Sequence, residues 1–187
     1  MAKNRLIVTS FETELGFMAF AADEGGVLNR IWFDYLSEAE LRSAMKANIE
    51  ASIWLEMQLE FDDRAQANLV RRFRKFARGN VDTFADLTID GAWMTAFQRR
   101  VVGQARRIPY GKTLSYGALA RKSGCPGAAR AVGSVMAKNR FPLVVPCHRV
   151  IASGRRLGGF SSVQGVTTKS RLLRMEGAIN EKGALIE

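Results

Sequence analysis

A thiol and an imidazole stand next to each other at Cys147 and His148, and His148 is the only histidine in the 187 residues. A cysteine thiolate is a strong nucleophile near neutral pH, and an imidazole supported by a carboxylate is the usual means of generating it. The apolar residues on both sides of Pro146 predict a buried active-site strand over residues 144–151. A buried cysteine is also often an inert small hydrophobe, so the pair alone leaves a catalytic and a structural interpretation open.

A candidate carboxylate and a candidate pocket wall follow the pair along the chain. Glu176 is the first acidic residue after Asp90. Its position makes it a candidate third member of a Cys-His-acid relay, while a surface glutamate near a helix end is the alternative. The glycine-rich segment 152–162 lacks the Gly-Lys-Ser/Thr ending of a phosphate-binding loop. We expect it to form one wall of a pocket beside the nucleophile.

Charge is distributed unevenly along the chain. Residues 91–175 contain 16 Lys and Arg and no Asp or Glu, whereas residues 1–90 contain 15 acidic and 11 basic residues. The formal net charge of the whole chain is +10. Such an asymmetry indicates a polyanionic partner. A solvated basic face is the alternative, but such faces normally mix both signs, so the pattern favours nucleic acid.

Two short helices should present this basic half to its partner. Residues 115–122 and 127–138 have helical patterns and are joined by the Gly-containing turn 123–126, which together predict a helix-turn-helix over about 115–138. The second helix is rich in Ala, Gly and Ser, and Arg130 is the one long side chain near its start. Small residues let a backbone approach a narrow groove, and a projecting Arg can fill a gap in a base stack. Close helix packing through Ala and Gly is the alternative interpretation.

The N-terminal half has the pattern of a small support domain. Alternating apolar residues predict an antiparallel sheet, with strands at 6–9, 16–20 and 27–33. Helices are predicted from Ser37 to about Ala47, where Ser37-x-x-Glu40 resembles a capping box, and over residues 65–77. Residues 52–63 are ambiguous, and residues 83–90 are predicted to be an extended linker.

The fold class predicted from these elements is α/β. A small N-terminal antiparallel-sheet-plus-helix domain (residues 1–90) precedes a mostly helical C-terminal domain (residues 91–187). In the second domain we expect a helix over residues 93–106 and a last helix beginning at Lys169. The first of these helices should turn four residues inward: Ala96, Phe97, Val101 and Ala105.

The composition argues against several other classes of protein. No apolar run has the length of a bilayer-spanning helix, and the first residues lack the pattern of a secretory signal. Two cysteines and one histidine are too few, at the wrong spacing, for a zinc site. We therefore expect no metal, no membrane association and a reducing compartment.

Longer motifs resemble those of the O6-alkylguanine-DNA alkyltransferases in order and spacing. They cover about residues 64–178 and are Ile108-Pro109-Tyr110-Gly111, Ser115-Tyr116-Gly117, Ala129-Arg130-Ala131-Val132-Gly133, Ala137-Lys138-Asn139, Pro146-Cys147-His148-Arg149-Val150, Gly158-Gly159-Phe160 and Leu172-Leu173-Arg174-Met175-Glu176. The combination of Pro-Cys-His-Arg-Val with an Asn eight residues before the cysteine is the most specific of them. Residues 1–60 match only as a sheet-and-helix domain.

The resemblance implies a DNA-repair protein that transfers the alkyl group of O6-methylguanine once to its own cysteine, without a cofactor. Cys147 would be the alkyl acceptor, His148 would deprotonate it through a water, and Glu176 would orient the imidazole. Tyr116 would help rotate the nucleotide and donate a proton to the leaving guanine. Asn139 would brace the turn beneath the nucleophile. An alkyl carbon inside a stacked duplex cannot be attacked in line, so base flipping is required.

The resemblance also assigns residues to DNA binding and to the pocket. Arg130 would fill the gap left in the duplex, which is approached through the minor groove. The other DNA-contacting residues would be Tyr116, Ala129, Gly133 and Ser134. The pocket would be lined by Val150, Phe160, Ser161, Pro142, Gly158 and Gly159. Within it, the Ser161 N–H would donate to O6, and the carbonyls of Cys147 and Val150 would accept from the guanine amine.

Three features depart from the pattern of the family. Phe160 stands where many members have Tyr, so any hydroxyl role is absent. The segment 163–168 adds about two residues, which leaves the pocket width open. Cys125 lies in the turn of the helix-turn-helix before a proline, and we expect it to be structural.

The expected partner is double-stranded DNA containing O6-alkylguanine, bound by a monomer, with cooperative binding along DNA as an alternative. Activity on O4-methylthymine should be weaker. The expected location is the cytoplasm at the nucleoid, or the nucleus in a eukaryote. Three rival functions are less consistent with the sequence. A lesion sensor of the alkyltransferase-like type would lack the cysteine, a transcription factor would need longer side chains on its second helix, and a Cys-His hydrolase would need an oxyanion hole.

Overall fold

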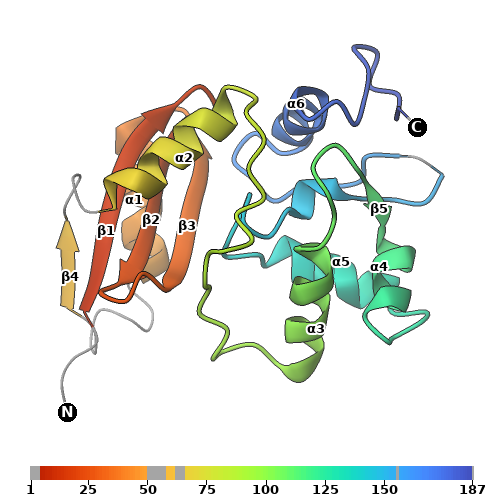
Figure 1. The fold of residues 1–187 in the computed structure, drawn as a ribbon, viewed down its shortest axis with the longest axis horizontal. Coiled ribbons are helices and arrows are strands. Elements are labelled where there is room, and N and C mark those ends of the chain that lie inside the picture. The colour runs from red at the N-terminus through yellow and green to blue at the C-terminus, as the bar shows by residue number, and fades with distance from the viewer. Residues whose placement is uncertain (1–4, 50–57, 62–65, 155, 187) are drawn as a thin grey trace. The chain divides into compact units, whose positions relative to one another are not determined.

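The computed structural model describes residues 5–49, 58–61, 66–154 and 156–186 (Figure 1). The chain divides into two compact units. The first comprises residues 1–80 and 86–90, and the second comprises residues 81–85 and 91–187. The mixed α/β fold class predicted from the sequence is confirmed. No helix among the described residues is long and apolar enough to cross a membrane.

The first unit is built on a four-stranded sheet in the order β3-β2-β1-β4. Strands β1 (Arg5–Thr13), β2 (Gly16–Asp23) and β3 (Leu28–Tyr35) are the predicted antiparallel strands. Strand β4 (Gln58–Phe61) lies in the ambiguous region and pairs parallel with β1. A parallel partner needs a long crossover, and α1 (Glu38–Ile49) lies within that connection.

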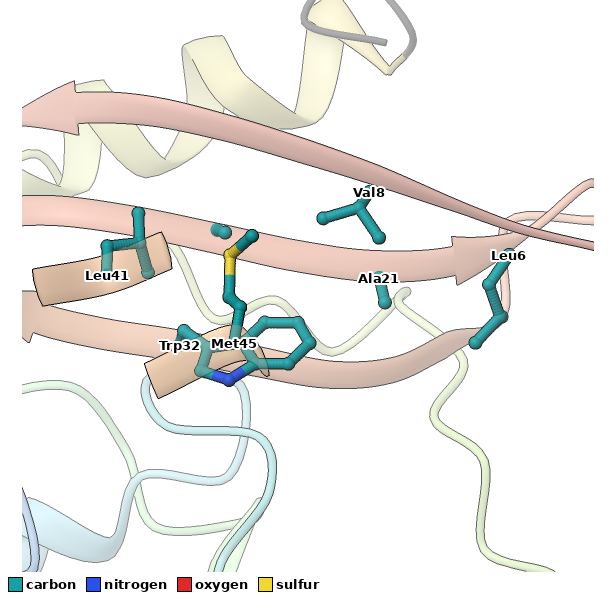
Figure 2. Packing of buried hydrophobic residues seen from close by; sticks show 7 residues of the cluster. Leu6, Val8, Ala21, Trp32, Leu41 and Met45 are labelled. Atoms are coloured by element: carbon teal, nitrogen blue, oxygen red, sulfur yellow. The ribbon is translucent and has the colours of Figure 1, made fainter. Parts of the chain in front are cut away.

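Helices α1 and α2 (Ala67–Ala77) cover opposite faces of this sheet. Successive strand residues face opposite sides. Val8 and its neighbour Ala21 therefore face α1, where Met45 and Trp32 complete a buried cluster (Figure 2). Phe11 faces the other side, where its ring lies 5.9 Å from that of Phe73 on α2. Coverage on both faces explains why β2 is buried along most of its length.

Two expectations about the first half need adjustment. The predicted linker 83–90 does not run freely away from the sheet. The residues on either side of Ile89 hydrogen-bond to Leu28 on β3, and one of these bonds runs from the Leu28 N–H to the Thr88 carbonyl. Ser37 begins α1 as predicted, since its hydroxyl accepts the Glu40 N–H at 3.2 Å. The Glu40 carboxylate instead accepts the N–H of Leu36.

The second unit is mostly helical. Helix α3 (Ala96–Ala105) precedes a helix-turn-helix made of α4 (Tyr116–Lys122) and α5 (Ala129–Ala137), and α6 (Val166–Met175) is the last helix. A two-stranded parallel sheet joins β5 (Leu114–Ser115) to β6 (Val150–Ile151). Strand β5 runs directly into α4, so this pairing ties the start of the helix-turn-helix to the segment that carries Cys147.

The predicted buried strand over residues 144–151 is wrong. Residues 142–144 form a turn, residues 147–149 a single 3-10 turn, and only Val150 and Ile151 are in a strand. Pro146 has no N–H for a strand ladder, and Leu143, at φ 71°, sharply redirects the backbone. The segment is nevertheless fully buried as predicted, because apolar residues report burial and not backbone conformation.

Two helix predictions are also corrected. Helix α3 begins after Thr95, whose hydroxyl accepts the Gln98 N–H, and Trp93 lies outside it. Of its four residues expected inward, Val101 and Ala105 are buried, Phe97 is half-buried and Ala96 is exposed in the first turn. Helix α6 begins at Val166, three residues before the predicted start. The added segment 163–168 is thus partly helical.

Candidate active site

Cys147 lies at the start of the 3-10 turn and its residue is 6% exposed. Asn139 positions the thiol through its side-chain amide. Its Nδ2 donates to Cys147 Sγ at 3.1 Å and to the Val145 carbonyl at 2.9 Å. The Asn139 Oδ1 accepts the Phe141 N–H at 3.0 Å. One amide therefore holds both the turn and the sulfur. Burial raises the pKa of the Cys147 thiol, and the Asn139 hydrogen bond and the Lys169 ammonium oppose that rise.

His148 and Glu176 form a fully buried pair, 28 residues apart in sequence. His148 Nε2 lies 2.8 Å from Glu176 Oε1. Arg149 adds two hydrogen bonds, from Nε to Oε2 and from Nη2 to Oε1, each at 2.9 Å, and the Gly111 N–H donates to Oε2 at 3.2 Å. The carboxylate thus faces four donors. The alternative of a surface glutamate is excluded.

These contacts decide the protonation states of the pair. Burial by itself raises the pKa of Glu176, but the hydrogen bonds and charges of His148 and Arg149 hold it at about 2. An ionised carboxylate can only accept a hydrogen bond, so Nε2 of His148 carries the hydrogen and donates it to Glu176. Burial lowers the pKa of His148, which leaves the ring neutral near pH 7. Its other nitrogen, Nδ1, is buried and has no hydrogen-bond partner in the described structure.

The turn at residues 108–111 encloses the carboxylate and its arginine. Arg149 Nη1 donates to the Ile108 carbonyl at 2.8 Å, and its guanidinium lies 5.6 Å from the centre of the Tyr110 ring. Gly111 has φ +72°, and a Cβ placed there would lie 2.7 Å from the Glu176 carbonyl oxygen. Only glycine fits this approach without strain. In the sequence these residues stood out only as a family motif, and their contacts with Arg149 and Glu176 were not predicted.

Lys169 is a second residue whose role the sequence did not reveal. It is completely buried on α6, where Nζ donates to the Val150 carbonyl at 2.6 Å and to the Gly159 carbonyl at 3.3 Å. It thereby ties the glycine-rich loop to β6. Burial lowers the pKa of Lys169 to about 8, although a charged thiolate at Cys147 would raise it. The available signal was its helical spacing: Leu172 and Leu173, three and four residues on, are both buried.

A cavity of about 320 Å³ opens onto the thiol, a volume within the range of small-molecule sites. Its lining comes from α4, α5, the 3-10 turn and the glycine-rich loop: Tyr116, Gly133, Met136, Ala137, Cys147, Gly159, Phe160 and Ser161. Met136 and Ala137 were not predicted. Of the expected pocket residues, Val150, Pro142 and Gly158 are not in the lining. The loop does form a pocket wall, as the sequence suggested.

Two details bear on the expected contacts inside this pocket. The carbonyls of Cys147 and Val150 each already accept one hydrogen bond, from the Val150 N–H and from Lys169 Nζ respectively. A carbonyl has a second lone pair, so a ligand would share these oxygens with the protein. Gly158, outside the lining, packs against Tyr116, since a Cβ there would lie 3.5 Å from the ring.

Helix α5 turns its small residues away from the core. Val132, Val135 and Met136 are buried, while Arg130 is exposed near the first turn. The remaining small residues are exposed or half-buried: Ala129, Ala131, Gly133, Ser134 and Ala137. Gly133 also lies beside Tyr116, because a Cβ there would be 4.0 Å from the ring. The outward surface of α5 is therefore smooth, with a single long cation near its start.

Cys125, in the turn before α5, is half-buried and lies 3.5 Å from Arg100 Nη2, outside the cavity. Among the described residues, no group of three or more His, Cys, Asp or Glu side chains could hold a metal ion.

The fold and this arrangement define a helix-turn-helix protein with a buried cysteine at a cavity that its second helix helps to line. Residues 96–178 match the family model described as the DNA binding domain of 6-O-methylguanine DNA methyltransferase. The methylated-DNA--protein-cysteine methyltransferase of Methanosarcina acetivorans is 32% identical over 169 residues, covering 90% of this chain and 96% of the relative. The chain therefore belongs to the methylated-DNA--protein-cysteine methyltransferase family of enzymes, as its motifs predicted.

A solved structure shares the fold of this chain, and further proteins are similar to it in sequence. The crystal structure of Mycobacterium tuberculosis OGT in complex with DNA matches with a TM-score of 0.71 at 29% identity, covering 96% of this chain and 95% of that one. A DNA base-flipping protein of Thermus thermophilus is 40% identical over 119 residues, covering 62% of this chain and 78% of that protein. Some other alignments span about 60% of the relative's own length.

Proposed function

We propose that this protein repairs DNA by a single transfer of the alkyl group of O6-methylguanine to Cys147, after the base has been flipped out of duplex DNA through the minor groove. The observation that carries the proposal is the buried thiol at the cavity, next to a neutral histidine and an ionised Glu176. Family membership and the DNA complex of M. tuberculosis OGT support DNA as the substrate.

Activation of the thiol is the first step of the proposal. Because burial raises the pKa of Cys147, the sulfur rests as a thiol and must lose its proton when the base arrives. The acceptor is His148 Nδ1, which has no protein partner in the described structure, and the proton passes through a water. The resulting imidazolium is stabilised by Glu176 at 2.8 Å. Asn139 and Lys169 stabilise the thiolate.

Transfer then exchanges one bond for another. The thiolate attacks the methyl carbon, so a sulfur–carbon bond forms as the carbon–O6 bond breaks. Tyr116, which lines the cavity, donates its proton to the departing guanine and recovers one from the relay. The thiol proton thus ends on guanine. The thioether has no hydrolysable bond, so each chain reacts once and needs no cofactor.

The outward surface of α5 suits the binding step. Its small residues allow the helix backbone to approach the minor groove, and Arg130 is the side chain long enough to occupy the gap left by the flipped nucleotide. Ser161 at the rim can offer its backbone N–H to O6. The mainly apolar lining, including Phe160 and Met136, is suited to a planar base. We expect one chain per lesion and weaker activity on O4-methylthymine.

The rival candidate is a protein that flips bases without reacting, since a relative of that name is 40% identical. Cys147 at the cavity favours transfer, because a non-reacting binder has no use for an activated thiol.

The test is to incubate the protein with duplex DNA containing O6-methylguanine and measure its mass. We expect one methyl group per chain on Cys147, saturating at one equivalent. Cys147→Ser should gain none, whereas the control Cys125→Ser should react like the wild type. Tight binding without any gain in mass would favour the base-flipping rival, and repeated turnover would refute the suicide mechanism.

A further inference from the structure

Helix α2 and the residue that follows it carry five basic residues among positions 71–78, in a half of the chain that is acidic overall. Its apolar face is fixed on the sheet, where Phe73 and Phe76 are completely buried. The opposite side is therefore presented to solvent, as the position of α2 over the sheet indicates (Figure 1). Its exposed cations are Arg71, Arg74, Lys75 and Arg78. Nothing in the proposed alkyl transfer uses this face.

These four cations line one side of a groove of about 760 Å³ between α2 and β1. The rest of the lining is Ser10, Phe11, Ala67 and Val70, and none of the lining residues is acidic. Two of the guanidinium groups are held by hydrogen bonds. Arg74 donates to the Glu12 carbonyl at 3.1 Å, and Arg78 donates to the Glu14 carboxylate at 2.6 Å. Because Arg78 is paired with a carboxylate, the net positive charge of the groove comes mainly from Arg71, Arg74 and Lys75.

We propose that this groove, the α2 groove, is a second DNA-contacting surface that binds backbone phosphates away from the lesion. This inference rests on the proposed function for the identity of the polyanion. Positions 71 to 78 span about 10 Å along the helix, a length over which duplex DNA carries about six phosphate charges. Lys and Arg along a groove without an acidic lining residue can make phosphate contacts that are independent of sequence, which suits a protein that must search long stretches of undamaged DNA.

The test removes two cations, Arg71 and Lys75, whose side chains form no hydrogen bond or ion pair outside α2 within the part of the chain that the structure describes. The double variant Arg71→Gln/Lys75→Gln leaves both anchored arginines in place, and among the described residues the Arg71 guanidinium hydrogen-bonds to Asn68 on the same helix. The matched control is Arg42→Gln/Lys46→Gln, which removes the same charge from exposed positions of α1 on the other face of the sheet. Affinity for an undamaged duplex of about 30 base pairs is measured between about 50 and 200 mM salt.

Two lost phosphate contacts should reduce the slope of log affinity against log salt by up to about 1.8, because each contributes about 0.9. The control should change the slope by less than half of that. Equal slopes for the two variants would overturn the inference. A change in the number of chains per duplex, measured by sedimentation, with the first chain's affinity unchanged, would also overturn it and assign the groove to a second copy of the protein.

Methyl transfer at saturating damaged DNA is followed in parallel and should proceed at the wild-type rate in both variants. This measurement separates the two proposals. If the wild type binds DNA but gains no methyl mass, the proposed chemistry fails while the salt comparison still decides the role of the α2 groove.

Discussion

Replacing Glu176 with glutamine tests the buried relay most directly. The substitution keeps the shape of the side chain but removes the charge that His148, Arg149 and Gly111 all face. The Arg149 guanidinium would then be a buried cation, 3% exposed, without its counterion. Breaking such a pair from one side is among the more costly single changes a protein can undergo.

The magnitude follows from the pKa of Glu176. It is about 2 in the folded chain against an ordinary value of 4.5. At about 1.4 kcal/mol for each tenfold difference in proton affinity, the ionised carboxylate contributes about 3 kcal/mol to folding at pH 7. Because the folded pKa is the lower one, this contribution is present above pH 4.5 and is lost as the pH falls towards 2. At pH 3 it should be about 1.4 kcal/mol.

The assay is denaturant-dependent amide exchange of α6, whose protection reports the stability of the second unit alone. We expect Glu176→Gln to lower that stability by about 3 kcal/mol at pH 7, with the gap to the wild type closing as the pH falls. Methyl transfer should slow by about a hundredfold or more, because His148 loses the group that stabilises its protonated form. The control is Glu181→Gln, an exposed carboxylate beyond the helix.

Two results would refute the reasoning. A loss below about 1 kcal/mol at pH 7 would mean that the four donors contribute little to holding the carboxylate ionised. A gap that does not change with pH would mean that the loss comes from packing and not from charge.

Three further substitutions have defined outcomes. Lys169→Met loses the hydrogen bonds to the Val150 and Gly159 carbonyls at every pH, but below pH 8 it also removes an ammonium that burial disfavours; its stability relative to the wild type in chemical unfolding should therefore be about 3 kcal/mol higher below pH 8 than above about pH 10.5, while methyl transfer slows. Gly111→Ala should destabilise the fold by about 1–3 kcal/mol in thermal unfolding and slow transfer, because its Cβ would meet the Glu176 carbonyl at 2.7 Å, whereas Gly103→Ala in α3, with open space around it, should stabilise. Asn139→Ala should raise the pKa of the Cys147 thiol, measured as a shift of its alkylation rate towards higher pH; an unchanged profile would contradict the role of the amide.

The sequence alone determined the local features of this protein. The Cys147-His148 pair, the two short helices around a Gly-containing turn and the alternating strands of the first unit depend on neighbouring residues, so their patterns are visible in the chain. Charge asymmetry likewise indicated the partner without any structure. The family motifs added roles for residues such as Asn139, whose contact with the thiol spans only eight positions.

Tertiary structure alone decided how distant residues combine. The sequence named Glu176 as a candidate partner of His148, 28 residues away, but nothing in it predicted that Gly111, 65 residues away, also donates to this carboxylate. Lys169 was hidden for the same reason, since its partners, the carbonyls of Val150 and Gly159, lie elsewhere in the chain. The segment 144–151 illustrates the limit physically: its apolar residues correctly predicted burial, but Pro146 and the hydrogen bonds of Asn139 determined that the buried backbone is a turn.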